Sequence, residues 1–155
     1  MEKIESFKIN HLNLFSGLYV SRIDQYNGIS TTTFDLRFTA PNRDTPMQMP
    51  AIHTLEHLGA TFFRNSAIKE QVVYFGPMGC RTGFYLVLFN NWQSQDLLPY
   101  VIDFCKFVID FNGEIPGATA VECGNYLEQD LANAKQYAQK YLSELKNHKR
   151  LQYPN

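Results

Sequence analysis

Two histidines four residues apart are the strongest candidates for chemistry in this sequence. His53 and His57 would lie about 40° apart around a helix, because each residue advances by about 100°. Such a pair on one helix face commonly holds a divalent metal. Glu56, beside His57, could accept or deliver a proton without being a ligand. The order His-x-x-Glu-His also occurs in one class of metallopeptidases, in which we would expect a carboxylate as the third ligand.

Cys123 is the candidate third ligand. It lies in a loop before Gly124 and Asn125, and because Asn125 is a good N-cap, we expect a helix to begin there and its positive end to favour a thiolate. Two imidazoles and one thiolate leave a fourth position for water or substrate, which is typical of catalytic metal sites. Two alternatives are open: Cys123 is a packed thiol, or the metal only braces a non-catalytic interaction module with Cys80 as its fourth ligand.

Cys80 is a second reactive candidate. It follows the turn formed by Pro77, Met78 and Gly79 and precedes Arg81, so we expect an exposed thiol beside a positive charge, where it could act as a base or nucleophile. A packed thiol is the alternative. Cys105 differs, because it recurs with apolar residues at helical spacing and is expected in the core.

The elements that must position these residues predict an α+β fold. The pattern indicates a hairpin over 17–39 that turns near Asn27 and Gly28, a helix over 50–64, strands over 72–75 and 82–89, a helix over 96–111 closed by Gly113, and a helix from Asn125 whose apolar side includes Leu127 and Leu145. We expect a single domain over 1–155, in which an antiparallel sheet packs against helices.

The predicted elements also have distinct faces. Phe34, Leu36 and Phe38 share one face of a strand, so Asp35 and Arg37 lie on the other. In the helix over 50–64, the apolar side opposite the histidines must pack against the sheet. Its members are Ile52, Leu55, Leu58, Phe62 and Phe63.

Composition excludes several classes of partner. The net charge is −1 and 45% of the residues are hydrophobic, so the chain has no basic surplus for nucleic acid and enough apolar side chains for a core. No apolar run reaches the length of a membrane span, and the charged N-terminal segment does not resemble a signal peptide. Three cysteines without an export signal favour a reducing compartment, and we expect a cytoplasmic protein.

Several separate segments together resemble one enzyme family. They are Glu5-Ser6-Phe7 with His11, Phe34 to Phe38, Pro41-Asn42, Ile52 to Leu58, Pro77 to Gly83, and Glu122 to Asn125. In this order they resemble the S-ribosylhomocysteine lyase family, also called LuxS, which makes the precursor of autoinducer-2. Asn10 and Tyr74 depart from the family, which usually has acidic residues at these two places.

The resemblance implies a homodimer with active sites near the subunit interface and one divalent metal per subunit. The implied ligands are His53, His57 and Cys123, and the implied metal is Fe²⁺, which Zn²⁺ or Co²⁺ can replace. The metal would act as a Lewis acid on the open-chain sugar, while Cys80 and Glu56 move protons and the carbonyl migrates from C1 to C3. Elimination would then release homocysteine and 4,5-dihydroxy-2,3-pentanedione.

The same resemblance implies a set of substrate contacts. Ser6, His11 and Arg37 match positions that contact the sugar, and Arg64 is a candidate for the amino-acid end of the substrate. The resemblance also implies a place in autoinducer synthesis, quorum sensing and the activated methyl cycle.

Overall fold

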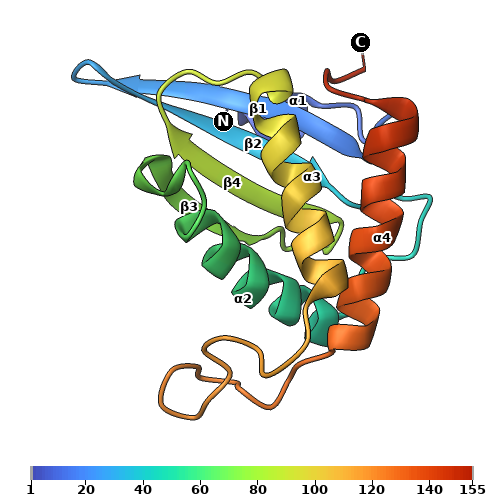
Figure 1. Cartoon of the computed structure of the whole chain (residues 1–155). Coiled ribbons are helices and arrows are strands. Elements are labelled where there is room, and N and C mark those ends of the chain that lie inside the picture. The colour runs from blue at the N-terminus through green and yellow to red at the C-terminus, as the bar shows by residue number, and fades with distance from the viewer. Residues whose placement is uncertain (1, 155) are drawn as a thin grey trace.

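A four-stranded antiparallel sheet forms the centre of the computed structural model, which describes residues 2–154. The strand order is β1-β2-β4-β3, with bounds β1 (Gly17–Tyr26), β2 (Ile29–Arg37), β3 (Val72–Pro77) and β4 (Gly83–Phe89). The helices are α1 (Glu5–Lys8), α2 (Met49–Arg64), the 3₁₀ turn η1 (Lys69–Gln71), α3 (Ser94–Asp110) and α4 (Leu131–His148). Helices α2, α3 and α4 cover one face of the sheet (Figure 1). The predicted α+β class, with an antiparallel sheet packed against helices in one domain, is confirmed.

The hairpin of β1 and β2 turns where the sequence predicts. Asn27 and Gly28 have φ values of 47° and 78°, and the strands pair directly from Tyr26 and Ile29 onward. A two-residue turn with both φ values positive matches the twist of the strands, and Asn-Gly adopts it at the lowest steric cost. The turn sets the register of the hairpin as far as Arg22 and Thr33, and a β-bulge between Val20 and Arg22 shifts it before Arg37 pairs with Gly17.

The core fills the space between the sheet and the three long helices. The predicted apolar strand face is confirmed, since Phe34 and Leu36 are both fully buried. On α2, Ile52, Leu55 and Leu58 are also buried, so the helix packs on the sheet with the side opposite its histidines. The hydrophobic contact of this side therefore determines the direction in which the two imidazoles point.

The prediction of a helix beginning near Asn125 is wrong. Helix α4 begins at Leu131, where the Asp130 side chain accepts a hydrogen bond of 2.9 Å from the Asn133 amide and caps the helix. The Asn125 side chain instead donates to the Glu128 carboxylate, and Leu127 is 79% exposed rather than part of an apolar helix face. Cys123 therefore gains no help from a helix N-terminus.

Helix α3 ends within one residue of the predicted position, but Gly113 does not close it. Its C-cap is Phe111, which is extended with φ −61° and ψ 131°, and Gly113, with φ 124°, lies in the following loop. This loop between α3 and α4 projects from the body of the molecule (Figure 1). None of the helices in the described part of the chain is long and apolar enough to cross a membrane.

Gly59 sets the distance between α2 and β3. A Cβ atom there would lie 2.2 Å from the Phe75 ring, well inside contact distance. We predict that Gly59→Ala destabilises the protein by about 1–3 kcal/mol, the usual cost of overpacking, although alanine alone favours helix by about 1 kcal/mol. Urea unfolding of Gly59→Ala, Phe75→Leu and the double variant measures this. We expect the double variant to lose less free energy of unfolding than the two single variants lose together, because Phe75→Leu relieves the clash. Strictly additive losses would contradict the clash.

Candidate active site

His53 and His57 lie side by side on α2 with their Nε2 atoms 3.0 Å apart. The Nδ1 atom of His53 is 2.8 Å from the Glu128 carbonyl oxygen, and that of His57 is 2.7 Å from the Pro116 carbonyl oxygen. A carbonyl oxygen only accepts hydrogen bonds, so each Nδ1 donates to it, and in a neutral imidazole the Nε2 atom then presents a lone pair. The two Nε2 atoms point at one place, as they would toward a shared cation.

Cys123 completes a group of three possible ligands. Its Sγ lies 3.4 Å from His53 Nε2, and the three ligand atoms are all within 4.8 Å of one another. In a tetrahedral site, two nitrogens would be separated by about 3.3 Å and a nitrogen and a sulfur by about 3.6 Å. The donor set therefore fits a divalent transition metal. Gly117, with φ of 70°, passes His57 so closely that a Cβ would lie 3.3 Å from Nδ1.

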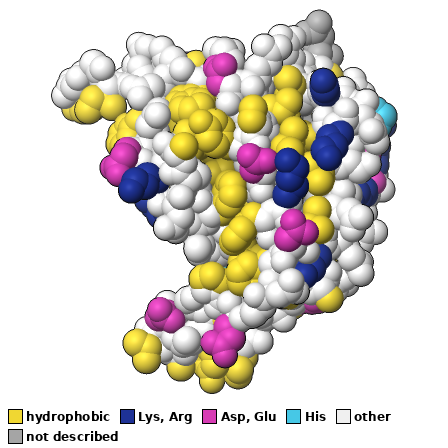
Figure 2. Space-filling view, in the orientation of Figure 1, with side chains coloured by type: hydrophobic (Ala, Val, Ile, Leu, Met, Phe, Trp, Pro, Cys, Tyr) yellow, Lys and Arg dark blue, Asp and Glu magenta, His cyan; other side chains and the backbone are white. Residues whose placement is uncertain are grey.

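The ligand group opens into a cavity of about 530 Å³ between α2 and the projecting loop. Its walls are His53, Glu56, His57, Ala60, Thr61, Phe75, Pro116, Gly117, Glu122, Cys123 and Gly124. Figure 2 shows the molecule hollowed between its body and this loop. Glu56 is half-buried and shares the cavity with the histidines, as its place next to His57 predicts. Substrate entering here would meet both the ligand group and a carboxylate.

Two predicted alternatives can be judged against this geometry. In the described residues, no carboxylate joins His53 and His57 as a third ligand, and the thiol of Cys123 holds that place instead. This disfavours the metallopeptidase. Cys80 is not part of the group either, so the described chain supplies no fourth protein ligand of the kind that a purely structural site requires.

Cys80 belongs to a second cluster, around Arg37. The guanidinium donates a hydrogen bond of 2.6 Å from Nη1 to Thr82 Oγ1, and the same Nη1 lies 4.0 Å from Cys80 Sγ. The sulfur is also 3.1 Å from Thr82 Oγ1. Cys80 is exposed, as predicted, whereas Arg37 is 2% exposed. Because Arg37 points away from the core face of β2, this cluster lies across the sheet from α2.

A buried carboxylate holds Arg37 in place. Asp35 Oδ2 lies 2.5 Å from Arg37 Nη2 and accepts a hydrogen bond of 2.9 Å from the Tyr153 hydroxyl. Burial raises the pKa of Asp35 above its ordinary value, although Arg37 and Tyr153 both favour the charged form. Burial also raises the pKa of Tyr19, whose ring stacks on Tyr153, to about 12. The cluster thus has a buried ion pair at its base.

The other three residues predicted to bind substrate, His11, Ser6 and Arg64, lie in different parts of the structure. His11 is half-buried with its Nδ1 2.9 Å from the Ile9 carbonyl oxygen, and its charge is the weakest of the influences that lower the pKa of Asp35. Ser6 is half-buried in α1. Arg64 donates to the carbonyl oxygens of Val72 and Val73 at 3.4 and 3.2 Å, which ties the end of α2 to β3. Arg64 is not in the wall of the cavity beside the histidines.

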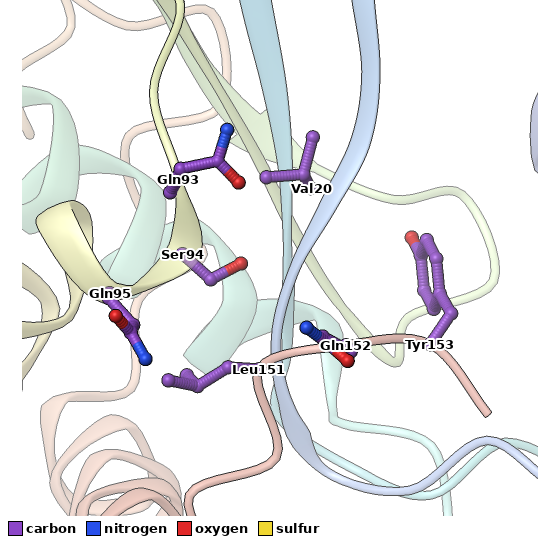
Figure 3. A pocket seen from close by; sticks show the side chains of 7 residues that line it. All are labelled: Val20, Gln93, Ser94, Gln95, Leu151, Gln152 and Tyr153. Carbon is purple, nitrogen blue, oxygen red and sulfur yellow. The ribbon is translucent and has the colours of Figure 1, made fainter.

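A separate cavity of about 380 Å³ lies beside β1, between the start of α3 and the C-terminal tail. Figure 3 shows the side chains that line it: Val20, Gln93, Ser94, Gln95, Leu151, Gln152 and Tyr153. None of these is a histidine, cysteine or carboxylate. This cavity therefore supplies no imidazole, thiolate or carboxylate for metal or acid–base chemistry.

Sequence reasoning missed the groups that orient the reactive side chains. The backbone carbonyls of Pro116 and Glu128 carry no sequence signal. Thr54 and Gln129, which join α2 to the loop, gave none either. Asp35 did have a usable sequence signal. Asp35 and Arg37 are oppositely charged, two residues apart on one face of a strand and flanked by phenylalanines, and this pattern indicates a buried ion pair.

The chain is similar over nearly its whole length to proteins of one family. A family model described as S-Ribosylhomocysteinase (LuxS) matches residues 4–152. The chain is 51% identical over 156 residues to the S-ribosylhomocysteine lyase of Finegoldia magna, with 99% of each chain covered. It is 50% identical to the S-ribosylhomocysteine lyase of Clostridium acetobutylicum, again with 99% of each covered. The enzyme of the same name from Borreliella afzelii is 48% identical, with 99% of this chain and all of that one covered.

The buried pair of Asp35 and Arg37 yields a stability prediction. Asp35→Ala leaves a buried guanidinium without its counter-charge, and we expect a loss of about 3–5 kcal/mol in the free energy of unfolding. Asp24→Ala is a matched control, since Asp24 pairs with Arg22 at the same spacing in β1 but both are more than half exposed. Its loss should stay below about 1 kcal/mol. Equal losses for both variants in urea unfolding would contradict the assigned role of burial.

Proposed function

Since the chain belongs to the S-ribosylhomocysteine lyase (LuxS) family, we infer that it cleaves the carbon–sulfur bond of S-ribosylhomocysteine to give homocysteine and 4,5-dihydroxy-2,3-pentanedione. The chain is a carbon–sulfur lyase of autoinducer synthesis. The observation that carries this conclusion is the orientation of both histidine Nε2 atoms toward each other and toward Cys123, beside a cavity that contains Glu56.

We propose that His53, His57 and Cys123 hold one divalent metal per subunit, with Fe²⁺ as the first choice and Zn²⁺ or Co²⁺ as substitutes. Two imidazoles and one thiolate suit all three ions. When bound, the metal supplies Lewis acidity toward the carbonyl and hydroxyl oxygens of the sugar. The protein supplies fixed ligands, a cavity wall and the groups that move protons.

Glu56 and Cys80 are the proposed proton carriers. Moving the carbonyl from C1 to C2 and then to C3 requires removal of a proton from the neighbouring carbon and return of a proton to the carbon left behind, with no net change in oxidation state. A carbonyl at C3 acidifies the proton on C4. Loss of that proton expels the sulfur on C5 as a thiolate, which takes up a proton to become homocysteine, and the enol that remains rearranges to the diketone. No redox partner is needed.

We propose that Arg37 and Thr82 orient the Cys80 thiol. Nη1 of Arg37 and the Thr82 hydroxyl both approach the sulfur, so they restrict its direction. Arg37 would also meet hydroxyl groups of the sugar, together with His11 and Ser6. Arg64 remains a weaker proposal for the amino-acid end of the substrate, because its guanidinium already serves two backbone carbonyls.

We propose that the active enzyme is a homodimer whose active sites combine both subunits. Within one subunit the cavity at His53 and the cluster at Cys80 are on opposite sides of the sheet, and Cys80 does not line the cavity. A second copy of the chain would bring the Cys80 of one subunit to the ligand group of the other. A reducing compartment, the cytoplasm, fits such a site because both Cys80 and Cys123 must remain free thiols.

Replacing Cys80 tests its proton-transfer role. We expect Cys80→Ala to lose at least about 100-fold in homocysteine release, the usual contribution of general acid–base catalysis, while it keeps its metal. The assay measures free thiol in protein-free filtrate after S-ribosylhomocysteine is added to anaerobically prepared enzyme, with metal content measured in parallel. Cys105→Ala, at a buried thiol outside both clusters, should remain active. Full activity in Cys80→Ala would refute the role, and inactivity of the wild type would refute the lyase.

Mixing two inactive variants tests the shared active site. A dimer of one Cys80→Ala subunit and one Cys123→Ser subunit contains one site with both groups intact. Random mixing should therefore restore about a quarter of wild-type activity, because half of the dimers are mixed and each has one working site. Activity after co-expression of the two chains measures this. Absence of any recovery, while the mixed dimer is shown by mass spectrometry, would place each active site within one subunit.

A further inference from the structure

Thr54 makes an unusual contact for a threonine inside a helix. It is fully buried, and in the sequence it lies between the metal-ligand candidate His53 and the core residue Leu55. A buried threonine in a helix usually turns its hydroxyl back to the carbonyl one turn earlier. Thr61 in the same helix does so, with 2.8 Å between its Oγ1 and the His57 carbonyl oxygen. The Thr54 hydroxyl leaves its own helix and reaches the loop instead.

Both hydrogen-bonding capacities of the Thr54 hydroxyl are used there. Its Oγ1 donates to Gln129 Oε1 at 2.7 Å and accepts from the Asp130 amide at 2.9 Å. The preceding loop residue, Glu128, accepts the hydrogen bond from His53 Nδ1 through its carbonyl oxygen. Three consecutive loop residues therefore contact two consecutive residues of α2. Thr54 binds Gln129 and Asp130, and these two residues hold the adjacent Glu128 carbonyl that orients His53.

This contact also closes the loop that carries Cys123. One end of the loop is tied to α2 where Pro116 accepts from His57, and the other end is tied where Asp130 binds Thr54 and caps α4. Cys123 lies between these two anchors. Fixing both ends of a loop reduces the volume that its middle can sample, and thus the entropy lost when the thiol joins a metal.

We propose that Thr54 and Gln129 are positioning residues for the metal centre. By fixing the segment 128–130, the Thr54 hydroxyl puts the ligands in place before the metal binds. The proposal rests on the metal-binding role given above to His53, His57 and Cys123. It assigns to Thr54 a task beyond core packing, because a residue of the same shape without a hydroxyl would fill the same space.

The test compares metal affinity among four variants. Metal-free protein is titrated with Zn²⁺ against a chromophoric chelator, and Co²⁺ spectra report the thiolate contact. Thr54→Val keeps the shape of the side chain and should weaken metal binding by about 10–100-fold, the usual effect of losing a group that orients a ligand. Thr54→Ser keeps the hydroxyl and should bind nearly as tightly as the wild type. Gln129→Leu removes the acceptor from the loop side together with the amide nitrogen that lies 3.3 Å from His53 Nδ1, and it should weaken metal binding as well.

Thr32→Val is the matched control, because Thr32 is also fully buried and its Oγ1 also donates to one oxygen, the Asn90 carbonyl, and accepts from one backbone amide, that of Trp92, but in β2 and outside both clusters. Its metal affinity should equal that of the wild type. If Thr54→Val lowers only the stability of the metal-free protein and keeps wild-type metal affinity, the residue is structural and the proposal is overturned. Gln129→Leu gives the same decision if Thr54→Val does not fold. A wild type that binds no metal would instead refute the metal centre itself.

Discussion

The convergence of two imidazole nitrogens and one thiol on a single place is the constraint on which the rest of this structure depends. His53 and His57 are kept with their Nε2 atoms 3.0 Å apart because two backbone carbonyls, from residues distant in sequence, bind their Nδ1 hydrogens. The apolar side of α2, which packs on the sheet, and the anchoring of the loop on both sides of Cys123 maintain this arrangement.

The sheet separates two kinds of chemistry. On the side covered by helices, the ligand group is open to a cavity and is made of two imidazoles and a thiol. On the other side, Arg37 and Asp35 form a buried ion pair beneath Cys80, and the C-terminal tail covers it through Tyr153. A strand supplies this division at no extra cost, because alternate side chains point to opposite faces. Leu36 serves the core while its neighbours on either side serve the reactive cluster.

Much of this arrangement follows from the sequence, and the exceptions have a physical cause. The Asn-Gly turn, the alternation in β2 and the two-sided pattern of α2 are local signals, and each predicted its element and its face. The start of α4 was misplaced because Asn125 and Asp130 are both good capping residues, and only the tertiary contacts of the loop decide between them. Thr54 looked like any small buried residue of a helix. Its role depends on a partner 75 residues away, which no local pattern identifies.

The position of the loop between α3 and α4 shows why an irregular segment can serve here better than a helix. A helix beginning at Asn125 would use its backbone groups within itself, and the Glu128 carbonyl would then be committed to a residue later in the same helix. Left outside the helix, that carbonyl is available to His53, and the Asp130 amide is available to Thr54. The delay of α4 until Leu131 is therefore part of how the site is made. Backbone groups that regular structure would occupy instead hold the histidines in one tautomer and direct both lone pairs at the place where a metal fits.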